Sequence, residues 1–164
     1  MSQEMILMSH PAAGVLAIIA AVWVLAETLN VSEANVARIR IASLVSAVMT
    51  WASYIVGGYW YVLYYAPDKA LIKAGPWPFA HSFFMETKEH VFLSLLLIAT
   101  YLPIAAFGNL VSSRGARQLV MWSAALIMLL GLGMERCRRL HCHGRQGCTH
   151  RQISAVPILK WRPT

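Results

Sequence analysis

Four long apolar runs restrict this chain to very few folds. They lie at about residues 11–29, 41–65, 79–107 and 119–134 and consist mostly of Ala, Val, Ile, Leu and aromatic residues. A helix needs about 20 mostly apolar residues to cross a bilayer. Only 13% of the residues are charged, compared with roughly a quarter in soluble domains. We therefore expect an all-α integral membrane protein built as a four-helix transmembrane bundle.

The ends of these runs give further expectations. Pro11 directly follows His10 and suits the first position of a helix. The second run ends in a group of aromatic residues, 59–65, and such residues gather at membrane interfaces. The fourth run covers only 16 residues before its apolar pattern stops at Met134. We therefore expect the fourth transmembrane helix to be truncated.

The positive charge of the chain is concentrated at its end. Residues 1–134 hold seven Lys and Arg against six acidic residues, whereas residues 135–164 hold seven against Glu135 alone. The pI of about 9.7 therefore describes the tail, and we expect no nucleic acid as a partner. The expected partner is the lipid bilayer, and the expected location is the inner (plasma) membrane of a bacterium.

Residues 135–164 differ in character from the rest of the chain. The segment RCRRLHCHGRQGCTH mixes three cysteines with three histidines, a composition that suggests zinc, but its spacing fits no standard zinc finger or ribbon. A shift of the reading frame by one base would turn these Cys, His and Arg codons mainly into small or apolar residues. We therefore separate a transmembrane domain, residues 1–134, from a basic Cys/His-rich tail, residues 135–164. We expect the tail to be disordered and hypothesise that it is a frameshift product; a basic tail on a membrane surface is the alternative.

The segment HSFFMETKEH, residues 81–90, places ionisable side chains at the start of the third run. On a helix from about residue 79, Glu86, Glu89 and His90 would share one face because they are three and four residues apart. They would lie roughly 12 to 18 Å from the helix start, at about 1.5 Å per residue, and thus within the bilayer. Ionisable residues inside a membrane are costly and mark candidate functional sites.

Three uses of this cluster compete. In the first, His90 ligates the iron of a b-type haem together with His10 or His81. Glu86 or Glu89 would then orient an imidazole, or His90 and Glu86 would bind a transition metal ion instead. In the second use, the cluster is a proton or ion path. In the third, it is an interfacial helix start, where Glu suits the helix dipole.

In general character the chain resembles small membrane proteins that carry b-type haem between paired histidines of a four-helix bundle. No residue role is taken from that resemblance. The sequence contains no nucleophile motif, phosphate-binding loop or dinucleotide fingerprint. Our leading hypothesis is a small membrane subunit with a haem b or metal redox centre at residues 81–90, which supports electron transfer with other membrane redox subunits. The alternative is a non-catalytic membrane subunit or a small proton or ion transporter without cofactor.

Overall fold

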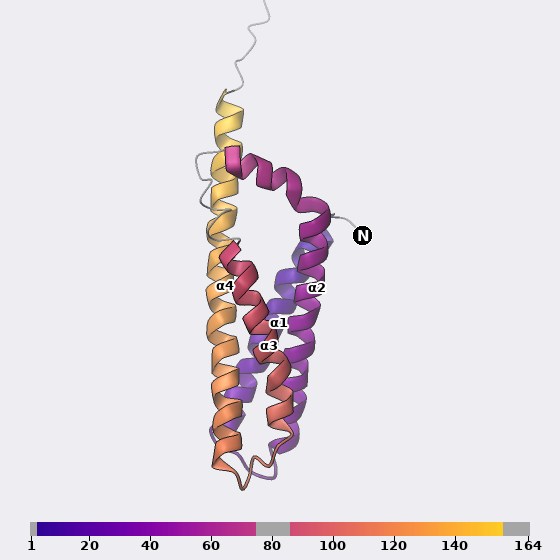
Figure 1. Cartoon of the computed structure of the whole chain (residues 1–164), viewed down its shortest axis with the longest axis vertical. Coiled ribbons are helices and arrows are strands. Elements are labelled where there is room, and N and C mark those ends of the chain that lie inside the picture. Colours follow the sequence, from indigo (N-terminus) through magenta and orange to yellow (C-terminus); the bar gives the residue numbers. More distant parts are fainter. Residues whose placement is uncertain (1–2, 75–85, 156–164) are drawn as a thin grey trace, which may run out of the picture.

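The computed structural model describes residues 3–74 and 86–155, which form helices joined by short connections (Figure 1). The four helices are α1 (Gln3–Thr28), α2 (Val36–Ala74), α3 (Glu86–Ala106) and α4 (Arg114–Ala155). Each contains a segment long and apolar enough to cross a membrane, namely Met8–Thr28, Val36–Ala66, Glu89–Ala106 and Arg114–Arg136. The expected all-α architecture with four membrane spans is confirmed.

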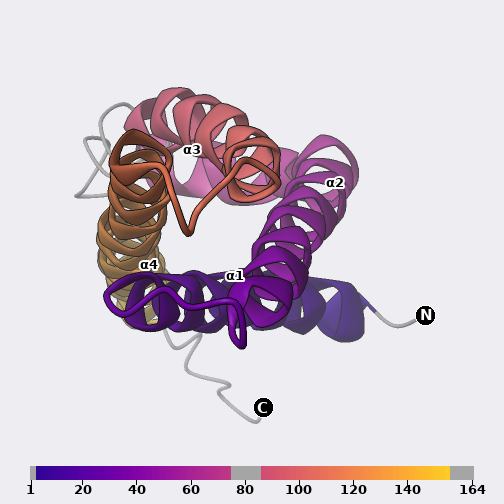
Figure 2. The same ribbon diagram turned by 90° about the horizontal axis from the view of Figure 1, so that it is seen from below.

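The four helices stand at the corners of a square, as the view along the bundle shows (Figure 2). α1 packs against α2 and α4, and α3 packs against the same two helices, so α1 and α3 occupy opposite corners. The chain changes direction at each connection (Figure 1). We call the end that holds the starts of α1 and α3 the terminal end. The end that holds residues 29–35 and 107–113 is the connection end.

The bundle encloses one set of apolar side chains and exposes another set of similar size. The side chains that are at most 1% exposed include Ala21, Val24, Ala99, Leu102, Ala124 and Ile127. More than half exposed are, among others, Val62, Leu97, Ile104 and Leu129. Exposed apolar side chains in such number are a liability in water. This arrangement therefore indicates a bundle surrounded by lipid.

A row of buried hydroxyl side chains follows the face of α2 that meets α1. Ser43, Ser46, Thr50 and Ser53 are spaced three or four residues apart, which puts them on one face. The Ser46 hydroxyl donates across the interface to the carbonyl oxygen of Ala17, at 3.1 Å. Small and hydroxyl residues let membrane helices approach closely, so this row marks the tight contact between α1 and α2.

The prediction that Pro11 starts the first helix is wrong. α1 begins at Gln3, and Pro11 lies inside it. A proline inside a helix removes one backbone hydrogen bond. Ile6, in the first turns before it, is buried in the bundle, whereas Met5 and Met8 are exposed.

α2 begins at Val36, before the predicted span, directly after Asn35, whose side chain bonds to the preceding connection. The Asn35 side-chain oxygen accepts from the backbone N–H of Ser32 at 2.9 Å. Its amide nitrogen donates to the carbonyl oxygens of Asn30 and Glu27, at 2.9 and 3.3 Å. These three bonds tie the α1–α2 connection to the start of α2 at Val36.

The described part of α3 begins at Glu86, so the predicted start at about residue 79 lies outside the described residues. Pro103 is buried inside α3, one turn before the helix ends at Ala106. Pro103 thus lies close to the end of the third span.

The predicted truncation of the fourth span is wrong. α4 begins at Arg114, five residues before the predicted start, and its candidate span covers 23 residues. The hydroxyl of Ser113 accepts from the N–H of Ala116 at 3.2 Å and caps the helix start. α4 then continues as one helix to Ala155. The division of the chain at residue 134 and the frameshift hypothesis stay predictions, which the coding DNA across codon 135 would test.

Candidate functional site

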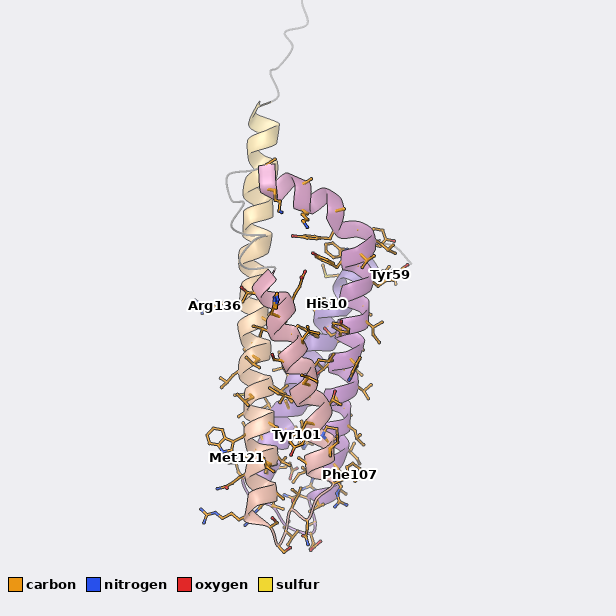
Figure 3. All side chains as sticks on the ribbon, viewed as in Figure 1. His10, Tyr59, Tyr101, Phe107, Met121 and Arg136 are labelled. Carbon is orange, nitrogen blue, oxygen red and sulfur yellow. The ribbon has the colours of Figure 1, made fainter. Side chains whose placement is uncertain are left out.

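A small pocket lies between the helices at the terminal end of the bundle. It has a volume of about 60 Å³ and is lined by residues of all four helices. Its polar side chains are those of His10, Thr50, Ser53 and Glu135, and its apolar wall includes Phe92. Figure 3 shows His10 within the bundle, far from Phe107 at the connection end. We call this cavity the His10 pocket.

The His10 ring is held against α2 by reciprocal hydrogen bonds. Its Nδ1 atom lies 2.8 Å from the carbonyl oxygen of Ser53 and 3.1 Å from the Ser53 hydroxyl. Because a carbonyl oxygen only accepts, Nδ1 carries a proton in this arrangement. The Ser53 hydroxyl donates to the His10 carbonyl oxygen at 3.1 Å. These bonds set both the tautomer and the orientation of the imidazole.

Gly57, one turn after Ser53, makes room for this ring. A Cβ atom at position 57 would lie 2.6 Å from Nδ1 of His10 and 2.8 Å from Cε1. Both distances are shorter than any stable contact. The absence of a side chain at Gly57 therefore allows His10 to lie on the backbone of α2.

Two ionisable residues of the pocket come from different helices. His10 belongs to the candidate span of α1 and Glu135 to that of α4, and both side chains are half-buried. By this measure of volume a cavity of about 10–15 Å³ holds one water molecule, so the pocket has room for a few. Imidazole, carboxylate and hydroxyl groups around so small a space suit the binding of a proton with a water molecule.

The residues predicted from the 81–90 cluster do not join this pocket in the described part of the chain. Glu86 is the first residue of α3, and the candidate span of that helix starts only at Glu89. The side chains of Glu89 and His90 are exposed and are not among the pocket's lining residues. His81 lies outside the described residues. Of the predicted site residues, His10 alone is shown to line the pocket.

A haem does not fit the His10 pocket as it stands. Pockets for drug-sized ligands are roughly 300–1,000 Å³, several times the 60 Å³ found here. Among the described residues, no three His, Cys, Asp or Glu side chains are grouped closely enough to hold a metal ion. The redox centre at residues 81–90 therefore stays a prediction.

Sequence reasoning missed Ser53 and Glu135. The spacing of the α2 hydroxyls by three and four residues was a usable signal, because it places a polar stripe on one face of an apolar helix. The nearness of Glu135 to His10 had no such signal, since 125 residues separate them in the chain.

No protein-family model, curated protein or solved structure matches this chain.

Proposed function

We propose that the protein is a small proton transporter of the membrane that works without a cofactor, and that His10 and Glu135 bind the proton. The observation that carries the proposal is their position in one small pocket inside the candidate spans. Histidine is the side chain that changes charge near neutral pH. In this proposal the imidazole of His10 and the carboxylate of Glu135 hold the proton together in the pocket that both line.

The hydroxyl row of α2 is the route we propose between the pocket and the connection end. Ser53 lines the pocket, and Thr50, Ser46 and Ser43 follow toward the other side of the membrane. The hydroxyls of Thr50 and Ser43 donate to carbonyl oxygens of their own helix, at 2.8 and 2.7 Å. Passage of a proton along the row requires these hydroxyls to rotate, with water joining the gaps.

Proton flux into liposomes tests the proposal. The purified full chain is reconstituted with a pH-sensitive dye inside the vesicles, and an outward potassium gradient with valinomycin drives proton entry. His10→Gln and Glu135→Gln should each lower the initial flux at least about tenfold, an effect typical of removing a proton-transfer group. Glu89→Gln is the matched control, because Glu89 is exposed and does not line the pocket.

Wild-type flux equal to that of empty vesicles would overturn the proposal. So would flux that Glu89→Gln lowers as strongly as His10→Gln, because the exposed start of α3 would then carry the proton. Circular dichroism and gel filtration of each variant show whether it is folded before its flux is compared. Fractionation of cell membranes tests the proposed location in a bacterial inner membrane.

A haem b or metal redox centre is the second candidate, and the orientation of His10 favours it. Metal-ligating histidines commonly donate one ring N–H to a backbone carbonyl, and His10 makes such a bond from Nδ1 to the carbonyl oxygen of Ser53. In this proposal His90 or His81 supplies a second ligand, and electrons pass to another membrane redox subunit. The pocket would have to widen considerably for a haem.

Absorption spectra of the oxidised and reduced protein, with metal analysis, distinguish the two candidates. A Soret band or stoichiometric metal that is lost in both His10→Ala and His90→Ala would establish the redox centre. A colourless, metal-free protein that transports protons would exclude it. A protein with neither property that co-purifies with a partner would be a non-catalytic membrane subunit.

A further inference from the structure

A groove lies on the outer side of α1 and α2 near the connection end, away from the His10 pocket. It has a volume of about 670 Å³ and is open to the surroundings of the bundle. One half is an apolar stripe of α1, because its residues are spaced three or four apart. These residues are Ile19, Val22, Trp23 and Ala26.

The other half of the groove is polar and lies where the spans of α1 and α2 end. Glu27, Asn30, Ser32 and Arg38 line it. The order of the two halves matches that of a lipid in its leaflet, with the apolar stripe toward the membrane centre and the polar groups at the surface. Neither water nor a free ion would cover the apolar stripe.

Arg38 is the cation that an anionic group in this groove would meet. Its side chain is 55% exposed, and it donates through Nε and Nη2 to the Glu27 carboxylate at 2.9 and 3.2 Å. A guanidinium group has five N–H donors, and Glu27 accepts from two of those of Arg38, which lines the groove. The start of α2, close by at Val36, adds the positive end of a helix dipole.

The connection end as a whole carries a net positive charge, as the Arg38 side chain does. Its described basic residues are Arg38, Arg40, Arg114 and Arg117, and its acidic ones are Glu27 and Glu33. Basic residues next to a membrane span attract anionic lipid headgroups. The excess of basic residues is therefore complementary to such a headgroup.

We propose that this groove binds one anionic phospholipid, with an acyl chain along the α1 stripe and its phosphate at Arg38. Arg38 would then bridge Glu27 and the phosphate. The bound lipid would cover Trp23, which is 55% exposed in the bundle alone. This lipid site is separate from the His10 pocket, which lies at the terminal end of the bundle.

Native mass spectrometry of the full chain in neutral detergent tests the proposal. The probes are dioleoyl phosphatidylglycerol and dioleoyl phosphatidylcholine at equal concentration, which share acyl chains and differ in headgroup charge. We expect the anionic lipid to bind about fivefold more tightly, the effect of roughly one basic residue at a membrane surface. Arg38→Gln should abolish this preference, and Arg38→Lys should keep most of it.

Arg114→Gln is the matched control, because Arg114 lies at the same end but does not line the groove. It should leave the preference unchanged. The proposal is overturned if the wild type binds both lipids equally, or if Arg114→Gln and Arg38→Gln have the same effect. It is also overturned if inorganic phosphate displaces the lipid completely, because the site would then recognise phosphate alone.

Discussion

His10 of α1 and Gly57 of α2 are in such close contact that no other residue type fits at position 57 without movement. A Cβ atom there would lie 2.6 Å from Nδ1 of His10. The same imidazole is bonded to the carbonyl oxygen of Ser53, one turn earlier. Close approach of the two helices and the orientation of the candidate proton-binding ring therefore depend on one another.

Replacing Gly57 by Ala should lower the thermal stability of the protein in detergent. Overpacking a well-packed site costs about 1–3 kcal/mol, which exceeds the gain of up to about 1 kcal/mol from the helix propensity of Ala. Gly58→Ala is the control, since a Cβ there meets nothing within 4 Å, and it should leave the melting temperature unchanged or raise it. Equal melting temperatures for both variants would show that the His10 ring does not lie against α2.

Gly131 allows close contact between α4 and α1, as Gly57 does between α2 and α1. A Cβ at position 131 would lie 2.7 Å from Cγ1 of Ile18, whereas one at Gly133 would meet nothing within 4 Å. Gly131→Ala should therefore destabilise the bundle by about 1–3 kcal/mol, and Gly133→Ala should not. Because Ile18 is the obstacle, Gly131→Ala combined with Ile18→Ala should lose less than the sum of the two single variants. Thermal unfolding of the four proteins measures this coupling, and strict additivity would contradict the contact.

Ser46→Ala should destabilise the α1–α2 contact more than Ser43→Ala does. Both serines are fully buried, but Ser46 donates to Ala17 on the neighbouring helix, whereas Ser43 donates within α2 to Arg40. Hydrogen bonds between membrane helices contribute about 0.6 kcal/mol on average and up to about 1.7. Unfolding in increasing sodium dodecyl sulfate gives the two free energies. A larger loss in Ser43→Ala would argue against the interhelical bond.

Asn35→Asp should lower the melting temperature at least as much as Asn35→Ala does, although Asp is closer to Asn in shape. Asn35 is buried, and its amide donates to two carbonyl oxygens while its side-chain oxygen accepts from Ser32. Asp keeps the acceptor but turns a carboxylate oxygen toward those carbonyls. Loss of buried hydrogen bonds costs about 1–3 kcal/mol, measurable as a lower melting temperature. An Asp variant as stable as the wild type would show that the two donated bonds are unimportant.

The candidate site could be predicted from the sequence only in part, because its residues come from different helices. His10 stood out as an ionisable residue beside an apolar run. Glu89 and His90 stood out equally, yet their side chains are exposed at the start of α3. Spacing along one helix shows which residues share a face, but it does not show whether that face meets a neighbouring helix or lipid.

The amino-acid sequence by itself determined that the chain forms four apolar helices long enough to cross a membrane. Long apolar runs with few charges have no other stable arrangement in a bilayer, and this holds whichever helices become neighbours. Only the tertiary structure decided that α1 and α3 lie at opposite corners. It also decided that His10 contacts Ser53 and Gly57 and lines the same pocket as Glu135. Those contacts depend on the rotation of each helix about its axis, which is set by packing of small residues between helices. Hydrophobicity alone leaves that rotation undetermined.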